Sequence, residues 1–118
     1  MSLDRAREAL EAAQICLERS LFQSATSRAY YATFWLAQVA LADVGLSRSE
    51  WRHPALQASF ANELIRRRKI YPAIFAQHFN RGLQLRLDAD YRPKGVSKRQ
   101  ATQAVLWAQE LLTAIINK

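Results

Sequence analysis

Glycine and proline are scarce in this 118-residue chain, at three residues each. Alanine, leucine, glutamine and arginine are abundant instead, which is typical of a chain whose backbone hydrogen bonds are made within helices. Half of the residues are hydrophobic, which is enough for one hydrophobic core. The chain is too short for two domains that would each need a core of their own. We therefore predict an all-α fold in a single domain, residues 1–118.

Cysteine and long apolar runs are also lacking. The lone cysteine, Cys16, lies among helical apolar positions and cannot form an internal disulfide. No run of about twenty apolar residues occurs, and no charged start leads into an apolar segment with a small-residue cleavage site. We expect neither a membrane span nor a signal peptide, and a cytoplasmic location.

A metal site finds little support in the sequence. Only two histidines are present, His53 and His78, and neither has a second ligand four residues away. Asp88 and Asp90 bracket one residue, but carboxylates two apart on a helix point in different directions. We expect no metal and no cofactor.

Positive charge is abundant and unevenly distributed. Lysine and arginine total 17 against 10 acidic residues, and residues 1–46 hold four basic and five acidic groups. Between Arg66 and Arg99 there are ten basic residues and two acidic ones. Such clustering favours a polyanionic partner, because lysine and arginine side chains that bind phosphates release their counterions. The alternative is a basic face that is simply exposed to solvent and keeps the protein soluble. The candidate nucleic-acid or nucleotide contacts are Arg66, Arg67, Arg68, Lys69, Arg92 and Lys94.

Apolar residues recur every three or four positions along most of the chain, which predicts amphipathic helices. Five helices are expected, over residues 3–19, 24–45, 53–68, 72–88 and from 97 onward. The helix after residue 24 is apolar almost all round between Ala29 and Val44. It is therefore either the central helix of a bundle or a helix shared between the core and a subunit interface.

Turn and cap residues mark the expected helix ends. Gly45 can close the second helix in a left-handed conformation, and Pro54 suits the first turn of the third. Ser47 with Glu50 has the spacing of a capping box before the third helix. Ser97 with Gln100 has the same spacing before the fifth.

Histidines, aromatics and one arginine are the remaining chemical candidates. His53 follows two arginines and could act as a base on a ribose hydroxyl, or could simply begin a helix before Pro54. His78 and the aromatic residues of the second helix suit the core. Arg28 precedes the apolar helix and needs a carboxylate if it is buried; Asp88 and Asp90 are the obvious suppliers.

Several motifs together resemble the HEPN domain family. They are "SRAYYATFWLAQVAL", a histidine that begins the third helix, Phe60, "RLDADY", and a last helix that contains "AQELLTAI". The resemblance runs essentially end to end. It implies an up-and-down bundle of four to five helices that dimerises, in a family whose members are often encoded beside a minimal nucleotidyltransferase in toxin–antitoxin pairs.

Many proteins of that family are metal-independent ribonucleases, with an arginine followed four to six residues later by a histidine. The counterpart of this arginine is Arg86, and the position five residues on is Tyr91. Tyrosine, with a pKa of about 10, is a poor general base at neutral pH. The resemblance thus favours a dimeric binding module over an endoribonuclease that would use Arg86, Tyr91 and His53.

A purely structural subunit of a larger assembly is the third alternative. For the structure we predict that Asp88 or Asp90 pairs with a basic group such as Arg28 or Arg92. We expect Arg86 and Tyr91 to face the dimer cleft.

Overall fold

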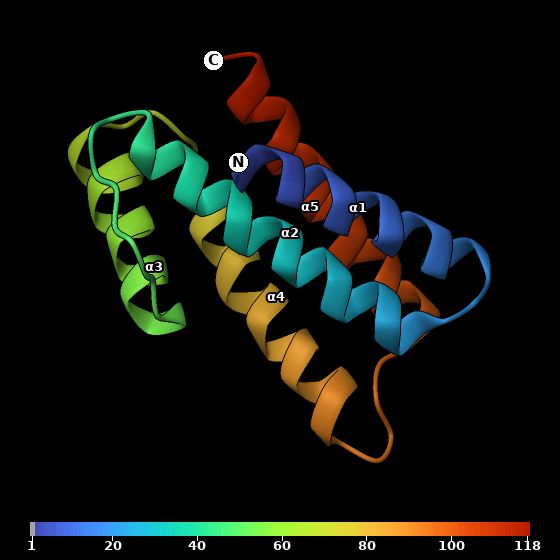
Figure 1. Cartoon of the computed structure of the whole chain (residues 1–118). Helices are drawn as coiled ribbons and strands as arrows, with labels where there is room; N and C mark the ends of the chain where they lie inside the picture. The colour runs from blue at the N-terminus through green and yellow to red at the C-terminus, as the bar shows by residue number, and fades with distance from the viewer. Residues whose placement is uncertain (1) are drawn as a thin grey trace.

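The computed structural model describes residues 2–118, and in these residues the predicted all-α bundle is confirmed. Four long helices alternate in direction, and a short helical segment packs across one end (Figure 1). The elements are α1 (Ser2–Glu18), α2 (Phe22–Ala42), α3 (His53–Ser59), η1 (Phe60–Arg67), α4 (Ile74–Tyr91) and α5 (Lys98–Ile116).

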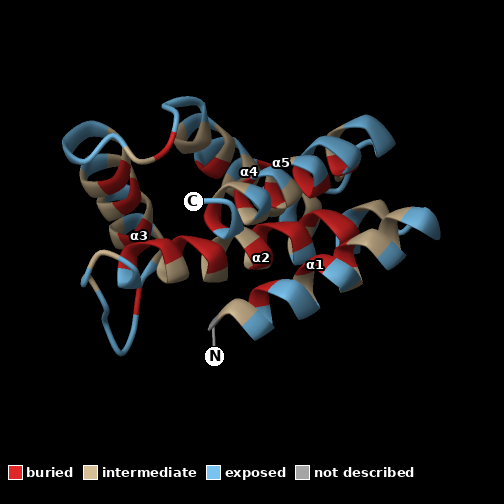
Figure 2. Cartoon of the chain, turned by 90° about the horizontal axis from the view of Figure 1, so that it is seen from above, coloured by how far each residue is buried: buried red, intermediate tan, exposed pale blue. Residues whose placement is uncertain are grey.

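Helix α2 is the centre of the bundle, as its apolar circumference predicts, and it contacts each of the other elements. Its inward positions are largely alanine, which lets neighbouring helices approach closely. Buried residues follow the inner faces of the surrounding helices (Figure 2). No residue of α2 between Ala29 and Leu41 is exposed. The prediction of a central helix is therefore confirmed, while Tyr31, Phe34 and Trp35 stay partly exposed on its outer side.

Most of the predicted cap and turn residues are confirmed, although α2 ends at Ala42, before the predicted end at 45. Gly45 has a φ of +82° after α2, and Pro54 lies in the first turn of α3. Ser97 and Gln100 form the reciprocal capping box of α5. The capping box predicted at Ser47 is wrong, because the chain stays irregular up to Arg52 and α3 begins without a side-chain cap.

The third predicted helix divides into two kinds of helix. After α3 the hydrogen bonds skip five residues, as from the Arg68 N–H to the Glu63 carbonyl, so that η1 is a π-helix. This wider turn still buries Phe60 and Leu64. The hydrophobic pattern did not predict this change. Over only eight residues, apolar positions three or four apart fit an α-helix and a π-helix about equally well.

The connection from α4 to α5 is tied to the start of α2. The Gln23 amide donates to the Val96 carbonyl at 2.9 Å and accepts from the Val96 N–H at 2.7 Å. Helix α4 itself runs three residues beyond the predicted end at 88, so "RLDADY" is helical throughout. Asp88 and Asp90 consequently lie on different faces of α4.

Candidate functional site

Four polar side chains of α2 and α4 form a connected group around Arg86, which we call the Arg86 cluster: Ser27, Tyr31, Arg86 and Asp90. Arg86 Nη2 donates to the Tyr31 hydroxyl at 3.0 Å, and Arg86 Nε lies 3.1 Å from Asp90 Oδ2. The Ser27 hydroxyl donates to Asp90 Oδ1. The Arg86 side chain is only 16% exposed. Its charge is therefore compensated inside the fold by one carboxylate.

A histidine and a tyrosine lie beside this cluster. His53, at the start of α3, has its Nδ1 2.7 Å from the Tyr30 hydroxyl of α2. The imidazole also packs on Phe34, with ring centroids 4.5 Å apart. Three elements of the bundle thus meet here, because α3 begins against the middle of α2 and α4 flanks it.

Burial and the Arg86 charge determine the protonation of this pair. Burial lowers the pKa of His53 below its ordinary value of 6.5, and the positive charge of Arg86 lowers that pKa further. Burial raises the pKa of Tyr30 well above its usual range. At neutral pH both groups are uncharged, so their contact is a hydrogen bond between neutral partners.

The structure brings together two of the three predicted catalytic residues. Two tyrosines connect them: the Tyr30 hydroxyl lies 2.7 Å from His53 Nδ1, its ring centroid lies 6.0 Å from that of Tyr31, and the Tyr31 hydroxyl accepts from Arg86. Tyr91 is 72% exposed, and within residues 2–118 it forms no hydrogen bond to either. A helix places residues five apart about 140° apart around its axis, which accounts for the separation of Tyr91 from Arg86.

Ser27, Tyr30 and Tyr31 are site residues that sequence reasoning missed. Their neighbours predict a core helix, and the prediction of core positions is confirmed for Tyr30, which is 2% exposed. A signal was available: buried phenol hydroxyls require hydrogen-bond partners. The sequence could not indicate which groups those partners are.

Of the two basic partners predicted for the aspartates of α4, Arg92 is confirmed and Arg28 is wrong. Asp88 pairs with Arg92, with Oδ1 and Nε 2.9 Å apart. Arg28 does not pair with either aspartate among the described residues; its guanidinium lies 5.9 Å from the Tyr31 ring centroid. Arg28 is exposed and needs no buried counterion, while Arg86 takes Asp90 one helical turn away.

The predicted basic residues separate into two patches. Arg66, Arg67, Arg68 and Lys69 are exposed at the end of η1, before α4 begins. Arg92 and Lys94 lie beyond the other end of α4, a helix of 18 residues and thus roughly 27 Å long. One small ligand cannot contact both patches.

The second patch borders an open groove of about 780 Å³ between the end of α4 and the start of α5, which we call the α4–α5 groove. Its charged lining residues are Arg81, Asp88, Arg92, Lys94 and Arg99. The single carboxylate, Asp88, is already paired with Arg92. The first patch differs, since Glu63 lies within 4 Å of both Arg67 and Arg68.

Neither a metal-binding cluster nor a membrane-spanning helix occurs among the described residues. In residues 2–118 no three histidine, cysteine, aspartate or glutamate side chains gather as a metal ion requires. None of the described helices is both long and apolar enough to cross a membrane.

Comparison with known proteins decides the family. The HEPN domain model matches residues 1–118. This chain belongs to the HEPN domain family. A protein of Thermotoga maritima named "UPF0332 protein" is 33% identical over 87 residues, which are 74% of this chain and 64% of the relative. The match therefore spans less than two thirds of that relative's length.

In this HEPN domain the motifs that carried the resemblance meet in space. "SRAYY" supplies Ser27, Tyr30 and Tyr31, and "RLDADY" supplies Arg86 and Asp90. The histidine that begins the third helix completes the group through Tyr30. The motifs are thus joined by side-chain contacts between α2, α3 and α4.

Proposed function

We propose that this HEPN-domain protein is a dimeric binding module that holds RNA or a nucleotide by its phosphates in the α4–α5 groove. The observation that carries the proposal is the charge of that groove, in which four basic side chains face one carboxylate that is already paired. A phosphate group binds most strongly to cations that have no carboxylate partner within the protein. The patch at the end of η1 adds contacts for an RNA long enough to reach it.

Fluorescence anisotropy with labelled single-stranded RNA tests the binding. Lys94→Ala with Arg99→Ala removes two groove charges and leaves the Asp88–Arg92 pair intact; we expect RNA affinity to fall by about tenfold or more. A triple variant removes the charges of the first patch: Arg66→Ala, Arg67→Ala and Arg68→Ala. It should bind a long RNA markedly more weakly and a mononucleotide with unchanged affinity. Absence of RNA binding in the unaltered protein would overturn the proposal.

An endoribonuclease is the second candidate, and the proximity of His53 and Arg86 favours it. Against it stands the low exposure of the Arg86 side chain, at 16%, together with its ion pair to Asp90, which already offsets its charge. Incubation with mixed RNA in EDTA, with Arg86→Ala and His53→Ala controls, separates the two functions. Cleavage that both substitutions abolish would make the protein an enzyme; we expect none.

The dimer in this proposal uses the outer face of α4. Leu87 and Tyr91 are one turn apart, and both are exposed. Light scattering should give a dimer at micromolar concentration. Leu87→Glu with Tyr91→Glu should yield a monomer, whereas Leu106→Glu, at another exposed apolar site, on α5, should leave the dimer intact. A monomeric unaltered protein would contradict this part.

The proposed partner is a nucleotidyltransferase-like protein, in a pair of the toxin–antitoxin kind. Its support is family membership alone, so the first test is to look for such a gene beside this one. Co-expression followed by co-purification is the second. A stable complex with other subunits and no RNA binding would instead favour a structural subunit of a larger assembly.

A further inference from the structure

An open groove of about 320 Å³ runs between α1 and α2, and we call it the α1–α2 groove. It shares no lining residue with the α4–α5 groove. Three of its lining residues are charged, Arg5, Glu8 and Arg28, and two are small, Ala9 and Ala12. The small side chains on α1 let the backbone of another helix approach closely at this place.

The charged side chains of this face have no ion-pair partner among residues 2–118. This holds for Arg5, Glu8 and Arg28 in the groove and for Asp4 in the first turn of α1. All four residues are exposed. The Arg5 guanidinium carbon lies 5.2 Å from the Trp35 ring centroid, a contact that leaves its charge uncompensated. Two cations and two carboxylates on one face are therefore open to an outside partner.

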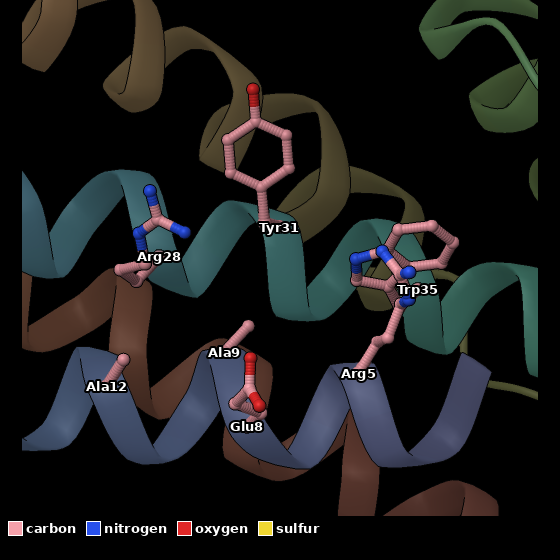
Figure 3. Close-up of a pocket in the computed structure, with 7 residues that line it drawn as sticks. All are labelled: Arg5, Glu8, Ala9, Ala12, Arg28, Tyr31 and Trp35. Carbon is pink, nitrogen blue, oxygen red and sulfur yellow. The ribbon is translucent and has the colours of Figure 1, made fainter. Parts of the chain in front are cut away.

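The charges alternate in sign along the groove. Figure 3 shows Arg28 at one end, above Ala12, and Arg5 with Trp35 at the other. The Glu8 carboxylate projects from α1 between these two ends (Figure 3). A nucleic-acid strand carries a negative charge at every phosphate, so that a carboxylate in the middle of the groove opposes it. A protein helix, whose surface can alternate in charge, complements this face better.

Helix α1 of a second copy carries charges that complement this pattern. Arg5 and Glu8 are three residues apart and thus neighbours on the surface of α1. We consider a second α1 that lies antiparallel over the groove, with a two-fold axis midway between these residues. Each Arg5 then faces Glu8 of the other copy. The same axis brings the first turn of the other α1, which contains Asp4, to the end of the groove at Arg28. A two-fold contact repeats each of these pairs.

The distribution of net charge also favours contact between copies at this face. Residues 1–46, which include α1 and α2, hold four basic and five acidic residues, although the whole chain has a net charge of +7. The ten basic residues between Arg66 and Arg99 lie outside these two helices. Two copies that meet at α1 and α2 therefore bring nearly neutral surfaces together and keep the basic segments out of the contact.

We propose that α1 and the α1–α2 groove form a self-association surface, on which two copies pair antiparallel through two Arg5–Glu8 and two Arg28–Asp4 ion pairs. This contact goes beyond the dimer proposed at the outer face of α4, because it uses other helices. Where both contacts form, dimers are joined into larger assemblies. Exposed ion pairs contribute little each and are screened by salt, so we expect a dissociation constant of roughly 0.1–1 mM at low salt.

Sedimentation velocity at increasing protein concentration tests this contact. In the variant Leu87→Glu with Tyr91→Glu the proposed α4 interface is removed, so failure of that interface does not affect the test. At low salt we expect this variant to be a monomer at about 10 µM and a growing fraction of dimer above about 100 µM; salt of about 0.5 M should abolish the dimer. The unaltered protein should show the same doubling of its mass. A mass that stays constant up to about 1 mM at low salt, in both proteins, would overturn the proposal.

Charge reversal identifies the first set of pairs. Arg5→Glu alone, or Glu8→Arg alone, places like charges opposite each other at two positions and should weaken association at least tenfold. The double variant Arg5→Glu with Glu8→Arg restores opposite charges, so its association should return to within about threefold of the starting value. Arg7→Glu is the control, because Arg7 is an exposed residue of α1 outside the groove. A double variant that associates as weakly as the single variants would overturn the pairing.

Reversal at the other end separates a second copy from other occupants of the groove. Arg28→Glu should weaken association at least tenfold, and the addition of Asp4→Arg should restore it. The affinity for labelled single-stranded RNA should change less than about twofold in Arg28→Glu, because the α4–α5 groove is intact. Loss of RNA affinity without a change in association would assign the groove to RNA and overturn the proposal. Association that none of these substitutions changes would place the contact on another face and also overturn it.

Discussion

At the scale of single residues, α4 carries two ion pairs of the same spacing in different surroundings. Arg86 and Asp90 have side chains 16% and 31% exposed, whereas Arg92 is 72% exposed beside Asp88 at 19%. Exposed pairs contribute little, because water and salt screen them and two long side chains lose rotamer freedom. Loss of one partner of a half-buried pair costs more, since the other partner is left without compensation.

Double-mutant cycles should separate the two pairs. We expect a coupling free energy of about 1–3 kcal/mol for Arg86→Gln with Asp90→Asn, measured by urea unfolding. The cycle of Arg92→Gln with Asp88→Asn is the internal control, with coupling of about 0.5 kcal/mol or less. Equal coupling in both cycles would contradict the burial difference.

The Arg86 charge should be visible in the titration of His53. Replacement by Arg86→Gln removes a positive charge that holds the His53 pKa down, so this pKa should rise. NMR titration of the two histidines measures the change. His78 is the control, because burial lowers its pKa and Glu110, not Arg86, raises it. A parallel shift of both histidines would show a general change in the fold instead.

Histidine titration also gives the protein a pH-dependent stability. Both histidines have a folded-state pKa below 6.5, so the unfolded chain binds protons first as the pH falls. The free energy of unfolding should therefore be constant from about pH 8 to 7 and fall below about pH 6.5. His53→Gln should flatten that fall, as measured by urea unfolding between pH 7.5 and 5.5. An unchanged slope would show that His53 titrates normally.

At the scale of the elements, the apolar period predicted five helical segments at about the right places, because burial of one face produces that period; the third of them divides into α3 and η1. Explicit cap residues such as Ser97 also predicted their helix end. The exact ends of α2 and α4 and the π-helix were not predictable, because they depend on tertiary contacts rather than local propensity. The Arg86 cluster required knowing that α2 and α4 lie side by side. Periodicity within one helix does not show which helices are neighbours. The sequence therefore predicts Arg28 as a partner of Asp90, whereas in the structure Asp90 pairs with Arg86.

The α4–α5 connection should be sensitive to a single methyl group. Gly95 has a φ of +66°, and an added Cβ would collide with the Gln23 side chain that holds Val96. Gly95→Ala should therefore destabilise the fold by about 2–4 kcal/mol, through both the left-handed backbone and the lost amide contacts. Thermal or urea unfolding gives the value.

Gly45→Ala is the matched control for that substitution. Gly45 also has a positive φ, of +82°, but nothing lies within 4 Å of an added Cβ. Only the backbone cost of about 1–2 kcal/mol should remain. Equal losses at Gly45 and Gly95 would mean that the Gln23 contact contributes nothing to stability.

At the scale of the whole molecule, positive charge lies at both ends of α4 while the Arg86 cluster between them is internally compensated. This distribution suits a protein that holds a phosphate chain across its surface better than one that acts on it at Arg86. A basic chain also associates faster with polyanions, and screening by salt weakens both effects.

The salt dependence of RNA binding tests the proposed phosphate contacts of the α4–α5 groove. The logarithm of the binding constant of single-stranded RNA against the logarithm of salt concentration should be a falling line, with a slope of about −0.7 for each phosphate contact. Lys94→Ala with Arg99→Ala should make that slope shallower by about 1.4. Arg7→Ala with Arg48→Ala, which removes the same charge outside the α4–α5 groove, should leave the slope unchanged. Binding that does not depend on salt, or equal slopes for both double variants, would contradict phosphate binding in the α4–α5 groove.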